Sequence, residues 1–127
     1  NNSFSIAYSK RIERPSFSEV NPFRVYSDFY SYDTGNPNLL PMLTDNIELS
    51  YIFKNNLSLT LYGSRLNQGR DYLTITNNSD NSVISTPQNY YNQNTLGIDI
   101  SYTYEPLKWI NSFNSLSAYY QNLILKM

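Results

Sequence analysis

Several stretches of the chain alternate residue by residue between apolar and polar side chains, and no other feature limits the possible folds as strongly. Side chains of a β-strand point to opposite faces in turn, so such a stretch forms a strand with one apolar and one polar face. The spacing of an amphipathic helix is not sustained anywhere in the sequence. We therefore predict an all-β chain of about five antiparallel strands. They cover residues 3–12, 46–53, 57–65, 95–104 and 110–120.

The predicted connections alternate between long and short. Long loops at 13–45 and 66–94 follow the first and third strands, and short turns at 54–56 and 105–108 follow the second and fourth. Barrels of the outer membrane have long external loops at one end and short periplasmic turns at the other. The lengths therefore favour up-and-down strands that form part of a transmembrane β-barrel.

The apolar stretches have the right length for membrane strands and are too short for membrane helices. No apolar run reaches the roughly 18 residues that a transmembrane helix needs, and the mean hydropathy is −0.50. A strand of about ten residues, tilted by about 45°, rises roughly 23 Å along the membrane normal. This rise is close to the apolar band of about 25 Å around such barrels.

Aromatic residues gather beside the two short turns. Tyrosine and tryptophan prefer the interface between lipid and water, where the ring is half apolar and half hydrated. We therefore expect a membrane girdle at one level of the sheet. It consists of Tyr51, Phe53, Tyr102, Tyr104 and Trp109.

A soluble β-sandwich is the alternative, since its strands also alternate between apolar and polar residues. It would be an extracellular carbohydrate-binding module whose tyrosines stack on sugars. The two folds differ in where Leu49, Ile98 and Ile100 point. They meet lipid in the barrel and pack against a second sheet in the sandwich.

Composition argues against several classes of function. Nine basic and ten acidic residues give a net charge of −1, which offers no electrostatic footprint for nucleic acid. The sequence contains no cysteine and no histidine, so we expect no enzymatic activity, no catalytic residues and no cofactor. The spacing of Asp28, Asp33 and Asp45 matches no calcium-binding loop, and no metal site is expected.

The segment from Tyr8 to Phe53 resembles the late-barrel portion of TonB-dependent outer-membrane receptors, in particular the outer-membrane protein β-barrel family. The matching residues are Tyr8, Ser9, Arg11, Arg14, Pro15, Asn21, Pro22, Phe23, Gly35, Asn36, Pro37, Leu39, Pro41 and Glu48 to Tyr51. Beyond Lys54 the likeness is confined to the rhythm of strands and turns and to the pair Lys108 and Trp109.

The resemblance implies a large barrel around a plug domain, located in the outer membrane of a Gram-negative bacterium, that imports a solute when the TonB complex supplies energy. The solute in such receptors is a ferric chelate, a glycan, a peptide or a cofactor. A scaffold barrel without transport activity is a further alternative.

The sequence shows no plug domain, and five strands cannot close a barrel, so we expect a piece of a longer protein. Its expected partners are outer-membrane lipid, the plug domain, the remaining strands and, through the missing region, the TonB complex. The isolated piece is expected to self-associate through its open edges.

The stretch GNPNLLP, residues 35–41, raises the question of what the first long loop does. Its prolines stiffen the loop, and Gly35 is expected to adopt a positive φ. The simpler reading is that this stretch packs the loop down over the strand ends. The functional reading is that the loop presents rings and charges to an external solute. The candidate contacts are Arg24, Tyr26, Asp28, Tyr30 and Tyr32.

Three charged residues fall near positions that face the interior of the predicted barrel. Glu48 and Asp99 follow the polar parity of their strands, and we place Arg65 with them, where the alternation fades. A charge in a wet lumen is usually only solvated, and we expect the same here; contact with a plug domain or with a solute path is the functional alternative.

Overall fold

The computed structural model describes residues 2–54, 56–107 and 109–126. Almost all regular structure in these residues is strand. They also form one helix of four residues, which was not predicted. Among the described residues, no helix combines the length and apolar character needed to cross a membrane. The elements are β1 (Asn2–Glu13), α1 (Phe17–Val20), β2 (Arg24–Tyr26), β3 (Ser31–Thr34), β4 (Met42–Phe53), β5 (Leu57–Asn77), β6 (Ser82–Leu107) and β7 (Ile110–Leu125).

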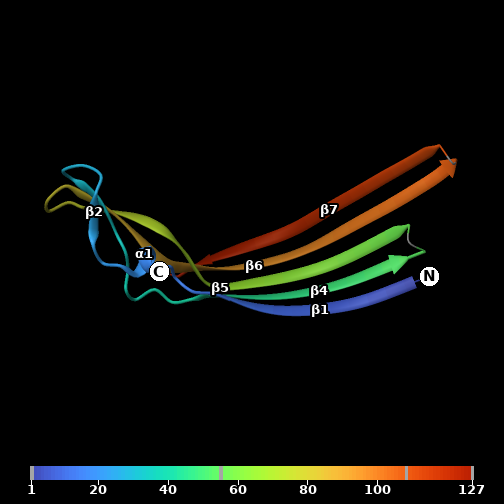
Figure 1. The fold of residues 1–127 in the computed structure, drawn as a ribbon, viewed down its shortest axis with the longest axis horizontal. Coiled ribbons are helices and arrows are strands. Elements are labelled where there is room, and N and C mark those ends of the chain that lie inside the picture. Colours follow the sequence, from blue (N-terminus) through green and yellow to red (C-terminus); the bar gives the residue numbers. More distant parts are fainter. Residues whose placement is uncertain (1, 55, 108, 127) are drawn as a thin grey trace. The chain divides into compact units, whose positions relative to one another are not determined.

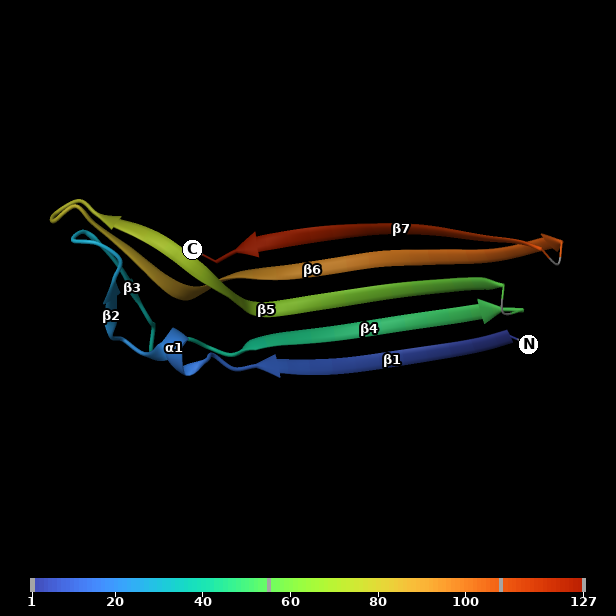
Figure 2. The ribbon, with the colours of Figure 1, turned by 45° about the horizontal axis from the view of Figure 1, so that its top comes forward.

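The strands form a single sheet. Its order is β1-β4-β5-β6-β3-β2, and β7 pairs with β6 as well. The long strands pair as neighbours in the order β1, β4, β5, β6 and β7, and Figure 1 and Figure 2 show that their arrows alternate in direction. The predicted all-β, up-and-down architecture is confirmed. The sheet has seven strands because the predicted loop 13–45 contributes the short strands β2 and β3.

The chain divides into two compact units, which we describe separately. The wall unit comprises Asn1–Arg11, Thr44–Arg65 and Gln93–Leu123. The loop unit comprises Ile12–Leu43, Leu66–Asn92 and Ile124–Met127. The wall unit contains both short turns, and the loop unit contains α1, β2 and β3.

The wall unit has two chemically different faces. On the apolar face, a Cβ built on Gly63 would lie 3.3 Å from Ile47 Cγ2 and 3.8 Å from Leu96 Cδ1. On the polar face, the hydroxyl oxygens of Ser50 and Thr60 lie 3.2 Å apart. The alternation read from the sequence therefore separates the two faces of the sheet as predicted.

The apolar face is not covered by protein among the described residues. Ile47 is 56% exposed and Leu96 is 66% exposed, and the buried apolar side chain, Leu39, belongs to the loop unit. A β-sandwich would bury such residues against a second sheet, whereas the described residues form only one sheet. This finding argues against the sandwich alternative, and an uncovered apolar face marks a surface that meets either lipid or another protein.

The prediction of a second long loop at 66–94 is wrong. β5 continues to Asn77 and β6 begins at Ser82, so only residues 78–81 connect them. Gln68 has a φ of 59°, which is the backbone conformation of one class of β-bulge. A bulge shifts the side-chain parity, so the alternation fades where the backbone pairing persists.

The backbone of Gln68 is stabilised by side chains of β6. Its N–H donates to Asn92 Oδ1 at 3.1 Å, and its carbonyl accepts from Asn89 Nδ2 at 2.6 Å. These two bonds replace ladder bonds that a left-handed residue cannot make in register. Asparagine at 89 and 92 therefore fixes the place where β5 changes parity.

The other element boundaries shift by a few residues. β4 begins at Met42 and not at residue 46, and β1 reaches Glu13, so the first loop is shorter than 13–45. The turn at 54–56 follows Phe53 as predicted, although Asn55 lies outside the described residues. The predicted turn 105–108 is wrong in extent, because β6 runs to Leu107. Lys108 lies outside the described residues, and Trp109 lies in the turn between β6 and β7.

Candidate functional site

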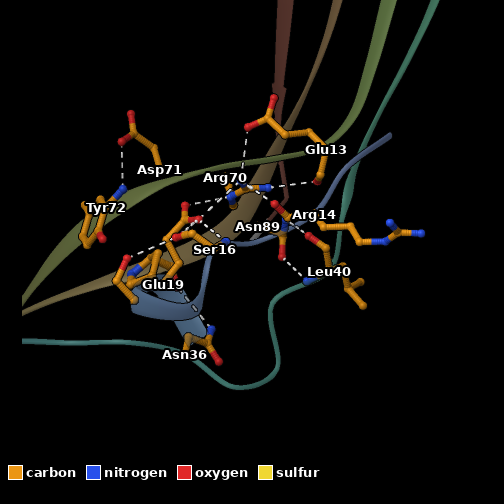
Figure 3. Close-up of polar contacts among 12 residues, drawn as sticks. Glu13, Arg14, Ser16, Glu19, Asn36, Leu40, Arg70, Asp71, Tyr72 and Asn89 are labelled. Atoms are coloured by element: carbon orange, nitrogen blue, oxygen red, sulfur yellow. Dashed lines mark hydrogen bonds and ion pairs between the residues drawn. The ribbon is translucent and has the colours of Figure 1, made fainter. Parts of the chain in front are cut away.

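The centre of the loop unit is a buried arginine, and Figure 3 shows its partners. The Arg70 side chain is only 7% exposed. Its Nε donates to Glu19 Oε1 at 2.9 Å, and its Nη2 donates to Glu13 Oε1 at 3.2 Å. Further bonds reach the carbonyl oxygens of Glu13 and Arg14 at 3.2 and 3.4 Å. We call this set of contacts the Arg70 clamp; it ties β5 to the end of β1 and to α1.

Glu19 belongs both to the clamp and to the start of α1. Its Oε2 accepts bonds from the backbone N–H and the hydroxyl of Ser16, each at 2.7 Å. Carboxylates are favoured in the first turn of a helix, where N–H groups have no partner in the helix. The Ser16 N–H, and after it the Arg70 guanidinium, lower the pKa of Glu19 to about 2 from its ordinary 4.5.

This lowered pKa predicts how the loop unit responds to acid. The folded pKa of Glu19 lies below its unfolded value, so the carboxylate stabilises the fold fully above about pH 4.5 and loses that effect as the pH falls toward 2. We expect hydrogen-exchange protection of the Asn36 amide, which donates to Glu19 O, to fall across this range. The Glu19→Gln variant, measured in the full-length protein, should show a flatter profile. An equally steep profile in that variant would assign the transition to other carboxylates.

The stretch GNPNLLP is attached to the clamp by backbone bonds. The N–H of Gly35 donates to Asn21 O at 2.9 Å, and that of Asn36 donates to Glu19 O at 2.7 Å. A Cβ on Gly35 would lie 2.7 Å from Asn21 N and 2.8 Å from Glu19 O. Glycine is therefore needed here for space. The prediction that Gly35 adopts a positive φ is wrong, since none of the glycines does so.

The rest of this stretch is held by β6. The Asn89 side-chain amide accepts from the N–H of Leu40 at 2.8 Å and donates to its carbonyl at 3.0 Å. Asn36 Nδ2 donates to Pro87 O at 3.2 Å, and both Leu39 and Pro87 are buried. These contacts support the structural reading of GNPNLLP: it fixes the loop in place.

The remainder of the loop forms a small hairpin. β2 and β3 pair antiparallel, with Tyr26 opposite Tyr32, and β3 pairs parallel with the start of β6. The Arg24 guanidinium lies 4.9 Å from the centre of the Tyr32 ring, a cation–π distance. The rings of Tyr26 and Tyr32 lie 5.3 Å apart and are tilted by 48°. Thus β2 and β3 place a positive charge among tyrosine rings.

These side chains line a recess of about 350 Å³, which we call the tyrosine recess. Four of the five residues predicted as ligand contacts lie in it. The fifth, Asp28, lines a neighbouring hollow, where its Oδ1 accepts from the N–H groups of Tyr30 and Ser31 at 2.7 Å each. Asp28 therefore stabilises the turn between β2 and β3. The recess is lined by Arg24, Tyr26, Phe29, Tyr30, Tyr32, Asn77, Asp80 and Ser82.

Half of this lining was not predicted from the sequence. Residues 77–82 fell within the predicted long loop 66–94, but the parallel pairing of β3 with β6 brings them beside the hairpin. Ser82 donates from its hydroxyl to Asp80 Oδ1 at 2.7 Å and from its N–H at 3.0 Å. These bonds lower the pKa of Asp80, so its carboxylate stays charged. No local sequence pattern predicts that residues 77–82 lie beside the hairpin, because this position depends on pairing between segments far apart in the chain.

The predicted interior and girdle residues all lie in the wall unit. Glu48 Oε1 accepts from the Ser50 hydroxyl at 3.2 Å and so shares the polar face, and Asp99 has the polar parity of β6. The girdle residues lie at the ends of β4 and β6 and in the following turn, and the rings of Tyr102 and Tyr104 stack at 6.2 Å. Their contact with lipid stays a prediction.

Arg65 does not share the polar face. It lines a hollow together with Ile47 and Gly63, which belong to the apolar face. Placing it near the interior was wrong, because the odd residues of β5 before Gln68 point the other way. Within the parts of the chain that the structure describes, no three His, Cys, Asp or Glu residues gather as a metal site would require.

Comparison with known proteins agrees with the fold. No curated protein matches the chain. The sequence profile described as "Outer membrane protein beta-barrel family" matches residues 1–126. Together with the single up-and-down sheet and its uncovered apolar face, this match shows that the chain belongs to the outer membrane protein beta-barrel family.

Proposed function

We propose that the chain is part of a TonB-dependent receptor of a Gram-negative bacterium, which imports a solute across the outer membrane. The tyrosine recess is the part of this chain that first contacts the solute. In this proposal the wall unit meets lipid and the plug domain, and the loop unit lies outside the cell. The chain acts by binding and carries out no chemical reaction.

The observation that carries the proposal is the composition of the recess. It combines one guanidinium, one carboxylate and several tyrosines in about 350 Å³, a volume within the range of small-molecule sites. Tyrosine supplies a stacking face and a hydroxyl at low entropic cost, and arginine binds anionic groups through two parallel hydrogen bonds. The likeness of Tyr8–Phe53 to TonB-dependent receptors adds support.

The Arg70 clamp gives the recess a rigid base. A loop that must be ordered on binding loses affinity to conformational entropy, whereas a preformed loop does not. Arg70 and Asn89 fix the segments on either side of the hairpin, and Gly35 allows these segments to approach closely. The loop therefore presents the recess without a large ordering cost.

Growth of a strain lacking the gene tests the proposal. We expect it to grow poorly when one ferric chelate, glycan, peptide or cofactor is the limiting nutrient. The full-length gene should restore growth, provided that TonB is present. A variant with Arg24→Ala and Tyr32→Ala should need about tenfold more of that nutrient, since bonds to a charged group contribute about 1.5–3 kcal/mol.

Arg14→Ala is the matched control, because Arg14 is exposed and takes part in the clamp only through its backbone oxygen, which accepts from Arg70. It removes the same charge and should leave the nutrient requirement within about twofold. Equal abundance of all variants in the outer membrane is checked by immunoblot. Unchanged growth of the deletion strain on every nutrient, or uptake that does not require TonB, would refute the proposal and favour a scaffold barrel.

A further inference from the structure

The apolar face of the wall unit carries a second recess whose chemistry differs from that of the tyrosine recess. It has a volume of about 370 Å³, and we call it the Gly63 hollow. Charged residues are unusual on a face that meets lipid, because their desolvation is costly away from the headgroup region. Residues that line the hollow include Tyr8, Asp45, Ile47, Gly63, Arg65 and Thr95.

Gly63 lies in the lining of the hollow and adds no side chain to it. Ile47 and Leu96 flank this position, with atoms 3.3 and 3.8 Å from where a Cβ would stand. A larger residue at 63 would fill the space between them. A narrow apolar chain in the hollow would therefore lie against the side chains of Ile47 and Leu96.

A larger apolar groove lies on β5, β6 and β7, so it shares two strands with the hollow. It has a volume of about 570 Å³ and is lined by Leu61, Leu96, Ile98 and residues of β7. Leu61 precedes Gly63 by two residues on β5, so both lie on the apolar face, and Leu96 borders both spaces. An acyl chain that starts over Gly63 can therefore continue along this groove.

The polar end of the hollow is positively charged overall. Arg65 is exposed, and no carboxylate of the described residues forms an ion pair with it. Lys10 Nζ lies 3.8 Å from Asp45 Oδ1, and that oxygen also accepts from the Tyr8 hydroxyl at 2.7 Å. Two cations and one carboxylate leave a net charge of +1.

We propose that the Gly63 hollow binds a lipid with a phosphate headgroup, held between Arg65 and Lys10, whose acyl chain lies over Gly63 and along the apolar groove. Lysine and arginine at a membrane interface extend their charges toward headgroups, and a guanidinium fits a phosphate through two hydrogen bonds. Asp45 holds Lys10 and the Tyr8 hydroxyl beside the hollow. The inference rests on membership in the barrel family and does not depend on solute import.

Lipid binding to the purified full-length protein tests this inference. Phosphatidylglycerol is titrated in dodecyl maltoside and the retained lipid is counted by native mass spectrometry. Arg65→Gln and Lys10→Gln should each weaken binding about fivefold, because a basic residue near an anionic lipid surface contributes about 1 kcal/mol. Gly63→Leu keeps the charges but blocks the acyl chain, and it should weaken binding by a similar factor.

Arg11→Gln is the control, since Arg11 adjoins Lys10 on β1 and therefore points to the opposite face. It should change the affinity by less than about twofold. Dioleoylglycerol, which lacks the phosphate, and glycerol 1-phosphate, which lacks the acyl chains, should both bind at least about tenfold more weakly.

Unchanged phosphatidylglycerol affinity in the Arg65→Gln, Lys10→Gln double variant would overturn the inference. Equal binding of glycerol 1-phosphate would also overturn it, because the site would then hold an anion and not a lipid. The two charge substitutions lie on an exposed surface and should not impair folding. They decide the question even where Gly63→Leu fails to fold.

Discussion

Replacement of Arg70 by alanine in the full-length protein is expected to raise the exchange rates of the Gly35 and Asn36 amides about a hundredfold, which corresponds to about 3 kcal/mol. The substitution leaves Glu19 without the guanidinium that compensates its partial burial, and removing one partner of such a pair costs about 3–5 kcal/mol. Both amides donate to the segment that contains α1, so they report directly on whether the clamp holds that segment.

Arg14→Ala is again the control, and it should leave both exchange rates within about threefold. It removes an exposed guanidinium from the same segment and keeps the carbonyl to which Arg70 donates. If the Gly35 and Asn36 amides exchange equally slowly in the Arg70→Ala and Arg14→Ala variants, the clamp is not what holds GNPNLLP. Hydrogen exchange is the appropriate measurement because it detects local opening while the barrel wall stays folded.

Substitution of Gly35 by alanine is expected to destabilise the loop unit by about 3 kcal/mol. The added Cβ would overlap Asn21 O and approach Asn21 N at 2.7 Å and Glu19 O at 2.8 Å. All three are backbone atoms, which cannot move aside as a side-chain end can. Relief requires that GNPNLLP separate from the end of α1, which breaks the bonds from the Gly35 and Asn36 N–H groups.

Gly63→Ala is the matched control for this substitution. There the added Cβ would lie 3.3 Å from Ile47 Cγ2, the end of a side chain, so a small adjustment suffices. We expect a cost of about 0.5 kcal/mol or less, compared by hydrogen exchange of both variants in the full-length protein. A cost at position 35 no larger than that at position 63 would show that the close backbone approach is not required.

The strands were predictable because their signal is local. Alternation over residues 46–53, for example, fixes which face Ile47 joins whatever the rest of the chain does. The prediction failed beyond Arg65, where the left-handed Gln68 shifts the parity. There the strand is defined by backbone pairing with β6 and by two asparagine side chains, which leave no apolar pattern to read.

The tyrosine recess was likewise predicted in part from local sequence and completed by strand pairing. The tyrosines of the first long loop led us to predict ligand contacts there. The structure brings four of the five predicted residues together in one recess, and their contact with a ligand stays a prediction. It also shows that Asp28 stabilises the turn between β2 and β3 by accepting from the Ser31 N–H, and that Asp80 and Ser82 complete the lining of the recess. Those two belong to the connection between β5 and the start of β6, so only the pairing of β3 with β6 could reveal them.

The sequence by itself determined the all-β class, the two faces of the wall and the family, because side-chain alternation and the residues from Tyr8 to Phe53 are properties of short segments. The tertiary structure alone decided the Arg70 clamp, the spatial need for Gly35 and the approach of Asp80 and Ser82 to the tyrosine recess. Each of these depends on contacts between strands far apart in the chain. Such contacts arise only when the sheet sets the register of its strands, and a single segment does not encode that register.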